Sequence, residues 1–269
     1  MDSTTWKPDS ALLLPRGIPI LLYHRVGPAV PGTYKNLTIP PQQFVEHMDW
    51  LETHGYRGVG LAALFDAART NSPARKTVVL TFDDGYESLM SHALPVLAER
   101  RFGATIFVVS KEIGGQNRWD WPAGSAPLPL MNAEQARQAL AAGLEIGSHS
   151  RSHPDLRQLK PDELESEICG SRDELADLLS APVVSFAYPF GYFDESALAI
   201  VERAYRYACT TEPGLNRRST PLRQLRRTMV RPDDSQREFG WRVRFGRNPA
   251  EDLHVAGYKV KRRLMGAFA

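Results

Sequence analysis

The sequence predicts an α/β fold in which parallel strands and helices alternate and the sheet closes into a barrel. Short β-rich runs alternate with helical patterns almost from end to end of the chain, as in parallel sheets joined by crossover helices. The number of such units within 269 residues favours a barrel over an open sheet. Polar side chains also follow several of the predicted strands, where β/α barrels build their active sites. An open, doubly wound sheet remains the alternative fold.

Each predicted strand is a short run rich in β-branched and aromatic residues. The strands are expected at 18–24, 57–60, 77–82, 104–109, 144–148, 183–188, 207–211 and 227–230. The helices expected between them include 42–53, 87–100, 133–142, 162–179 and 195–205. Asn132 and Asp194 stand at N-cap positions, and Pro161 fits the first turn of its helix. The one long loop, 113–130, is rich in Gly, Pro and Trp.

Composition is that of one soluble domain, which we expect over residues 1–269. The chain is 42% hydrophobic and 24% charged, ordinary values for a globular enzyme. Cys169 and Cys209 do not form a Cys-x-x-Cys pair, so neither a disulfide framework nor a zinc finger is indicated. No apolar stretch approaches the roughly 20 residues of a membrane span. With Met1 as the native start, the proline-broken leucine run at 12–14 is a poor signal peptide, and we expect a cytoplasmic location.

Positive charge is concentrated near the C-terminus, in a basic segment from about residue 231 and in the residues just before it. Residues 215–263 hold 14 Lys and Arg against 5 Asp and Glu, whereas the whole chain has a net charge of only +2. One interpretation is a solvated basic face. The other is attraction to an anionic partner, such as a lipid head group or a phosphate-bearing substrate, with possible membrane association. We expect no nucleic-acid partner.

Carboxylates and histidines follow two of the predicted strands. Asp83 and Asp84 come directly after strand 77–82, and His149 and His153 follow strand 144–148. One carboxylate oxygen and two imidazole nitrogens form a ligand set that leaves a divalent metal an open position for water and substrate. The spare carboxylate beside it is a candidate base. The competing interpretations are a turn at Asp84-Gly85 that stabilises a helix N-terminus, and two unrelated histidines.

Three motifs resemble those of the NodB-type polysaccharide deacetylases, carbohydrate esterase family four. They are Thr-Phe-Asp-Asp-Gly at 81–85, His-Ser-x-x-His at 149–153 and Phe-Ala-Tyr-Pro-Phe-Gly at 186–191. Their order and spacing match over about residues 18–230. The resemblance implies a distorted (β/α)7 barrel with Asp83 as general base and with Asp84, His149 and His153 as metal ligands. Zn2+ is the first expectation for the metal, with Co2+, Ni2+ and Mn2+ as alternatives.

The chain departs from the family pattern at two places. Ala187 stands where the third motif usually has an arginine that supports the catalytic aspartate, and the late Leu-x-His motif is absent, with only His254 near the C-terminus. The segment Tyr-His-Arg-Val at 23–26 resembles the Tyr-His motif of a permuted subgroup that includes poly-N-acetylglucosamine deacetylases. That likeness implies His24 as the general acid. Arg227, in a predicted late strand, is the candidate to replace the missing arginine.

The resemblance implies a metal-dependent hydrolase that removes an N-acetyl group from an amino sugar in a glycan or glycoconjugate. The candidate oxyanion donor is the backbone N–H of Phe190, with Tyr188 at the same strand end. Trp119, Trp121 and Tyr192 are candidates to stack on a sugar ring. Two alternatives stay open: a deacetylase or deformylase of a small or lipid-linked sugar, and an inactive carbohydrate-binding homologue.

Overall fold

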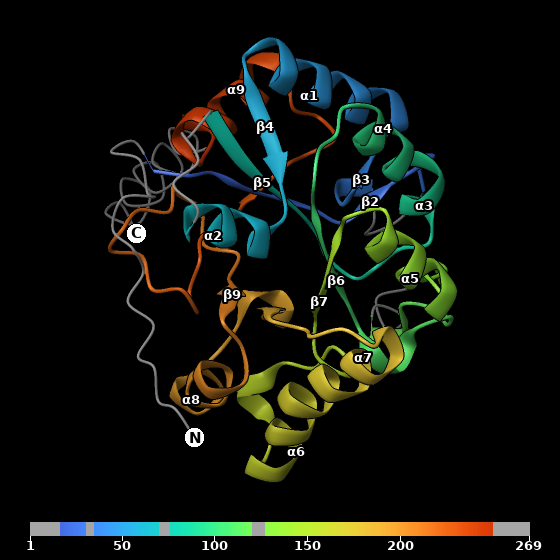
Figure 1. Ribbon diagram of the computed structural model, residues 1–269, viewed down its shortest axis with the longest axis vertical. Helices are drawn as coiled ribbons and strands as arrows, with labels where there is room; N and C mark the ends of the chain where they lie inside the picture. The colour runs from blue at the N-terminus through green and yellow to red at the C-terminus, as the bar shows by residue number, and fades with distance from the viewer. Residues whose placement is uncertain (1–16, 31–34, 70–75, 120–126, 250–269) are drawn as a thin grey trace, which may run out of the picture.

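Eight parallel strands form the central sheet (Figure 1). The computed structural model describes residues 17–30, 35–69, 76–119 and 127–249. Within these residues the strand order is β10-β1-β5-β6-β7-β8-β9, and β4 pairs with β5 beside this path. The strands are β1 (Ile20–Tyr23), β4 (Tyr56–Val59), β5 (Lys76–Phe82), β6 (Thr105–Val108), β7 (Glu145–Ser148), β8 (Ser185–Ala187), β9 (Tyr207–Cys209) and β10 (Thr228–Met229).

One short segment joins the two edges of the sheet. Leu225 forms a parallel bridge with Cys209 of β9, and three residues later Thr228 pairs with Leu21 of β1. Because the same stretch of chain contacts both edge strands, the sheet curls round into a distorted α/β barrel. This confirms the fold class expected from the sequence.

Alternation along the strands divides the core into two layers. The layer inside the barrel includes Ile20, Val79, Phe107, Ala187 and Cys209. The layer between strands and helices includes their neighbours Leu21, Leu80, Ile106 and Phe186. All of these side chains are buried. The strands are therefore apolar on both faces, as expected for a parallel sheet that helices cover.

The helices are α1 (Pro41–Thr53), α2 (Leu61–Arg69), α3 (Ser88–His92), α4 (Leu94–Glu99), α5 (Ala133–Ala141), α6 (Pro161–Glu165), α7 (Ser171–Leu179), α8 (Glu195–Ala204) and α9 (Gln236–Phe245). Most of them surround the sheet on its outer side, whereas α2 packs on the inner layer through Leu61, Leu64 and Phe65 (Figure 1). The predicted caps are confirmed: Asn132 forms a capping box with Gln135, and Asp194 accepts a hydrogen bond from the Ala197 N–H. The sequence patterns did not indicate α2, α9 or the small sheet of β2 (Arg25–Val26) and β3 (Thr38–Ile39).

Two helices that were expected to be continuous are interrupted. The helix predicted at 87–100 is divided at Ala93 into α3 and α4, because Pro95 lacks an N–H and its ring crowds the preceding turn. The helix predicted at 162–179 contains a π-helical turn, Ser166–Gly170, between α6 and α7. None of the described helices is long and apolar enough to cross a bilayer.

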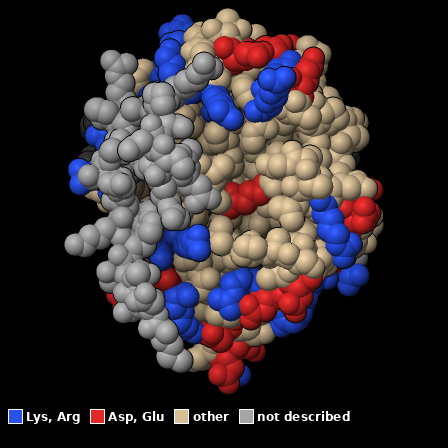
Figure 2. All heavy atoms as spheres, in the orientation of Figure 1, with Lys and Arg blue, Asp and Glu red and all other residues tan. Residues whose placement is uncertain are grey.

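The amino-terminal ends of β6, β7, β8 and β9, together with the carboxyl-terminal end of β4, surround a cavity of about 760 Å³. Figure 2 shows the hollow in this face of the molecule. Among its lining residues, Glu145 is the acidic one and is held by hydrogen bonds from Thr105 and Ser185. The predicted chemistry lies at the opposite ends of the strands, so this cavity is separate from the candidate site.

Candidate active site

The candidate site forms where β1, β5, β7 and β8 end. The N–H of Asp83 donates to the Tyr23 carbonyl at 3.0 Å, which joins the end of β5 to the end of β1. The N–H of His149 donates to the Val108 carbonyl at 2.9 Å, which joins β7 to β6. His24, Asp83 and His149 therefore follow the carboxyl ends of nearby strands, as predicted for a parallel barrel.

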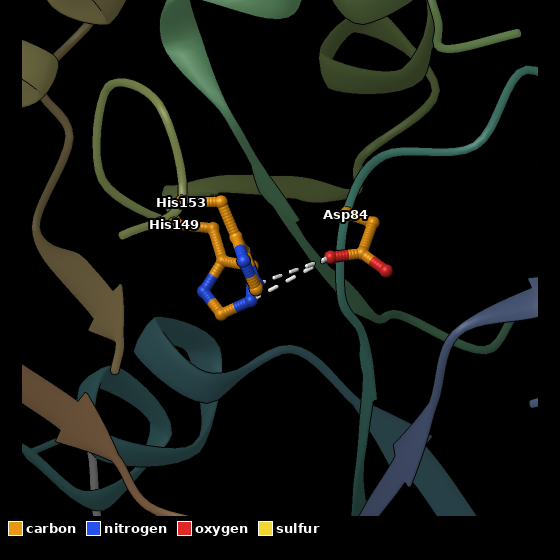
Figure 3. A group of neighbouring side chains, drawn as sticks. All are labelled: Asp84, His149 and His153. Carbon is orange, nitrogen blue, oxygen red and sulfur yellow. Dashed lines mark ion pairs between the residues drawn. The ribbon is translucent and has the colours of Figure 1, made fainter. Parts of the chain in front are cut away.

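Asp84, His149 and His153 converge in one buried group (Figure 3). Their exposed fractions are 4%, 2% and 6%. Oδ1 of Asp84 lies 3.7 Å from Nε2 of each histidine, and one potential ligand atom from every member lies within 4.8 Å of the others. The two imidazoles come from the loop after β7 and face the carboxylate across a small gap (Figure 3).

The protonation state of the two histidines suits metal binding. Nδ1 of His149 lies 2.7 Å from the Ala187 carbonyl, which can only accept, so Nδ1 carries the proton and Nε2 is left as a lone-pair donor. Burial lowers the pKa of His149, and burial with the neighbouring His149 lowers the pKa of His153 well below its usual value. Neutral imidazoles and an ionised carboxylate are the donors that divalent cations such as Zn2+ bind.

Unusual backbone conformations accompany these residues. Asp84, Ser150, His153 and Phe190 have φ values of 72°, 65°, 61° and 58°, in the left-handed region. Such conformations cost energy in residues other than glycine and are concentrated at functional sites. At Asp84 the reversal turns the chain directly after β5. Two adjacent carboxylates that would point to opposite faces of a strand are thereby both brought to the site.

Asp83 forms a buried, bidentate ion pair with Arg227. Nη1 and Nη2 of Arg227 donate to Oδ1 and Oδ2 of Asp83 at 2.6 and 2.7 Å, and its Nε donates to the Thr210 carbonyl. Burial alone raises the pKa of Asp83, but the charge and the hydrogen bonds of Arg227 outweigh it and lower the pKa to about 2. Asp83 is therefore ionised throughout the neutral range. Arg227, the candidate to replace the arginine that Ala187 lacks, is thus in direct contact with Asp83.

His24 directly follows β1, is half-buried as a whole residue, and lies close enough to Asp83 and Arg227 for their charges to act on it. Burial lowers its pKa to about 4; Asp83 raises the pKa, whereas Arg227 and His149 lower it further. The imidazole is therefore neutral at neutral pH. Asp83 lies near enough to attract a proton to His24, but desolvation outweighs that attraction.

Aromatic rings form the rim of the site. Trp119 stacks on His153 with ring centres 4.7 Å apart, and Phe190 meets His153 edge-on at 4.6 Å. Phe190 and Tyr192 are 46% and 47% exposed, and the Arg157 guanidinium lies 4.0 Å above the Tyr192 ring. No hydrogen bond from the Phe190 N–H is found within the described residues.

One of the predicted substrate-contacting residues, Tyr188, does not line this rim. Tyr188 reaches the strand end as expected, but its side chain is fully buried and its hydroxyl donates to the Arg223 carbonyl at 3.1 Å. The phenol therefore packs behind the site. Trp121 lies outside the described residues, as does His254.

Fold and site together define an α/β-barrel protein with an Asp-His-His group buried at the carboxyl ends of its strands. The family model for polysaccharide deacetylases matches residues 70–208, about half of the chain. "Putative polysaccharide deacetylase YxkH" of Bacillus subtilis (strain 168) is 30% identical over 228 residues, which cover 84% of this chain and 76% of the relative. The chain belongs to the polysaccharide deacetylase family.

Two further relatives are similar over much of the chain. The structure of the Streptococcus pyogenes deacetylase PplD in complex with acetate has a TM-score of 0.71 and 27% sequence identity, and the match covers 84% of this chain and 98% of that one. The poly-beta-1,6-N-acetyl-D-glucosamine N-deacetylase of Staphylococcus aureus (strain MRSA252) is 20% identical over 179 residues. That match covers 63% of this chain and 59% of the relative.

Proposed function

We propose that this protein is a metal-dependent hydrolase that removes N-acetyl groups from amino sugars of a glycan. The observation that carries the proposal is the buried group of Asp84, His149 and His153, with the ionised Asp83 directly beside it. A carboxylate and two neutral imidazoles would hold the cation, for which Zn2+ is the first candidate. Once bound, such a cation supplies Lewis-acid polarisation of the amide carbonyl and makes water more acidic.

Asp83 has the role of general base in this proposal. Its carboxylate is ionised at neutral pH and is fixed by both nitrogens of the Arg227 fork, so it is ready to accept a proton from the attacking water. A carboxyl group with a pKa of about 2 holds that proton weakly. Arg227 therefore orients the Asp83 carboxylate and keeps it ionised, but it also makes this carboxylate a weaker base.

His24 is proposed to deliver a proton to the departing nitrogen. The water oxygen bonds to the acetyl carbon, the carbon–nitrogen bond breaks, and the amine leaves with a proton while acetate remains. Because the pKa of His24 is about 4 and that of Asp83 about 2, the imidazole holds a shared proton more firmly than the carboxylate. A proton taken from water is thus directed toward His24. The Phe190 N–H is the proposed donor to the developing oxyanion.

The exposed rim supports a sugar as substrate. Phe190 and Tyr192 present aromatic faces beside His153, and Trp119 lies on the other side of that ring. Aromatic faces of this kind pack against the apolar faces of pyranose rings. The relatives named for poly-N-acetylglucosamine also support an N-acetylated amino sugar. A missing third-motif arginine would favour an inactive carbohydrate-binding homologue, and the Arg227–Asp83 pair argues against that alternative.

Two variants test the metal site and the base separately. His153→Ala is expected to lose both metal and deacetylation. Asp83→Asn is expected to keep the metal while the rate falls by roughly 10²–10⁴. Metal content is measured by elemental analysis, and acetate release is measured on polymeric, lipid-linked and small N-acetylated sugars. Full metal occupancy in His153→Ala contradicts the ligand set, and no acetate release from any substrate by the wild type contradicts the proposed reaction.

A further inference from the structure

The loop that carries the two histidines is held by a glutamate from the helical segment that follows it, 15 to 16 residues further along the chain. Oε2 of Glu167 accepts hydrogen bonds from the N–H groups of Arg151 and Ser152, both at 2.9 Å. Its Oε1 accepts a third from the Ser152 hydroxyl at 2.7 Å. One carboxylate thus binds both peptide N–H groups between Ser150 and His153.

Glu167 belongs to the π-helical turn Ser166–Gly170, which divides α6 from α7. Such turns are rare and are frequent at functional sites. A Cβ added at Gly170 would lie 3.0 Å from Cδ and 3.3 Å from Nε of Arg151. The same turn therefore makes two contacts with the loop. Glu167 supplies the carboxylate that binds its peptide groups, and Gly170, which has no side chain, leaves room for the Arg151 side chain.

Other contacts hold the opposite side of the loop. The carbonyls of Ser150 and Arg151 accept from the N–H groups of Ser110 and Lys111. Arg151 pairs with Glu174 on α7, and Glu174 also accepts from the Ser110 hydroxyl at 2.6 Å. The backbone of the loop is thus hydrogen-bonded from two directions.

This support counteracts a strained backbone. Ser150 and His153 adopt left-handed φ values of 65° and 61°, conformations that persist only where the surroundings impose them. They set the directions in which the imidazoles of His149 and His153 leave the chain. Releasing the peptide groups between them would let the loop relax and would separate the two Nε2 atoms.

We propose that Glu167 is a positioning residue that preorganises the His149–His153 loop for metal binding. The proposal rests on the metal site proposed above. The hydrogen bonds of Glu167 go to Arg151 and Ser152 and not to a ligand, so its effect is transmitted through the peptide groups that it binds. Outer-shell partners of this kind typically change metal affinity by 10–100-fold.

Metal affinity measured directly tests this role. Zn2+ binding to the chelator-treated protein is followed by competition with a chromophoric chelator. Glu167→Ala is expected to raise the Kd roughly 10–100-fold. Glu167→Gln is expected to stay within a few-fold of the wild type, because its amide oxygen can still accept the two N–H groups and its amide nitrogen can donate to Ser152. The charge of Glu167 is removed in both variants, so charge alone cannot produce this difference.

Asp173→Ala is the matched control. Asp173 lies on α7, is 62% exposed at its side chain and pairs with Arg172, so its removal is expected to leave the Kd unchanged. Wild-type affinity in Glu167→Ala overturns the proposal, as does equal weakening in the Ala and Gln variants. His153→Ala separates the two levels: if the wild type binds Zn2+ and His153→Ala does not, the metal site stands whichever result Glu167 gives. A wild type that binds no Zn2+ overturns both.

Discussion

Arg227 and Asp83 are the most strongly coupled side chains of the candidate site. The arginine is fully buried and reaches Asp83 from 144 residues further along the chain. Removing one partner of a buried ion pair leaves the other charge without compensation, which typically costs about 3–5 kcal/mol. The pair is therefore expected to affect stability and, in the proposed mechanism, the ionisation of the base.

Arg227→Met is expected to destabilise the protein by about 3–5 kcal/mol. It should also raise the pKa of Asp83, because burial is then no longer offset by the guanidinium. Activity that depends on ionised Asp83 would consequently be lost at a higher pH than in the wild type. Denaturant unfolding and the acid limb of the pH–rate profile measure the two effects. Arg227→Lys keeps the positive charge but not the bidentate guanidinium. Its stability and its acid limb are expected to lie between those of the wild type and of Arg227→Met.

Arg242 provides the control for this experiment. It forms a similar buried, bidentate pair with Asp234 at 2.6 and 2.7 Å. Arg242→Met is expected to reduce stability without moving the acid limb. An acid limb that moves equally in both variants would show that general loosening, and not the loss of the partner of Asp83, caused the shift.

His24 is tested by the combination of turnover and metal content. His24→Ala is expected to reduce turnover by roughly 10²–10⁴ while metal content stays at the wild-type level. Because its pKa of about 4 makes it neutral in the resting protein, the alkaline side of kcat/KM should not report its titration between pH 6 and 8. Near-normal turnover in the variant would remove His24 from the mechanism.

At the scale of elements, β7 depends on a glycine. Gly147 lies opposite Phe107 in the register of β6 and β7. A Cβ added to it would lie 2.5 Å from Cδ1 of Phe107 and 2.6 Å from Oγ of Ser185. The barrel interior is filled here by the Phe107 ring, and the missing side chain makes room for it.

Gly147→Ala is therefore expected to cost about 1–3 kcal/mol, as overpacking of a filled core does. Combined with Phe107→Leu, which vacates part of the space, the loss should be smaller than the sum of the two single losses. Denaturant unfolding of the two single variants and the double variant measures this coupling. Strictly additive losses would show that the two residues do not compete for space.

At the scale of the whole molecule, buried neutral histidines make the fold sensitive to acid. Burial lowers the pKa of His24 to about 4 and of His47 to about 3, and it also lowers those of His149 and His153. As the pH falls below about 6.5, these histidines become protonated in the unfolded chain but stay neutral in the folded protein, so the folded state loses stability. Asp83 adds a loss in the same direction between about pH 4 and pH 2, because its folded pKa is lowered.

The free energy of unfolding of the chelator-treated protein is therefore expected to fall steeply from pH 6.5 to pH 4, by up to about 1.4 kcal/mol per pH unit for each such histidine. His47 lies outside the site, stacks on Phe239 and contacts the Tyr23 hydroxyl. His47→Gln should reduce the slope over this range by about one proton. An unchanged slope would show that folding does not lower the pKa of His47.

The sequence by itself determined the parts of this protein that local patterns encode. Alternating runs indicated a parallel α/β barrel, capping residues located helix ends, and Asp83, Asp84, His149 and His153 followed predicted strands. These predictions succeeded because a strand end fixes where the next few residues lie in a parallel sheet. The division of α3 from α4 was equally local, since Pro95 accounts for it.

Only the tertiary structure decided which distant groups support those residues. The contacts of Arg227 with Asp83 and of Glu167 with the histidine loop join segments with no shared periodicity or motif. Burial, likewise, placed Tyr188 behind the site and made His24 neutral. Hydrogen-bond partners and desolvation depend on how complete elements pack. The partner and the charge of a side chain are therefore properties of the whole fold, whereas its position at a strand end can be predicted from the local sequence.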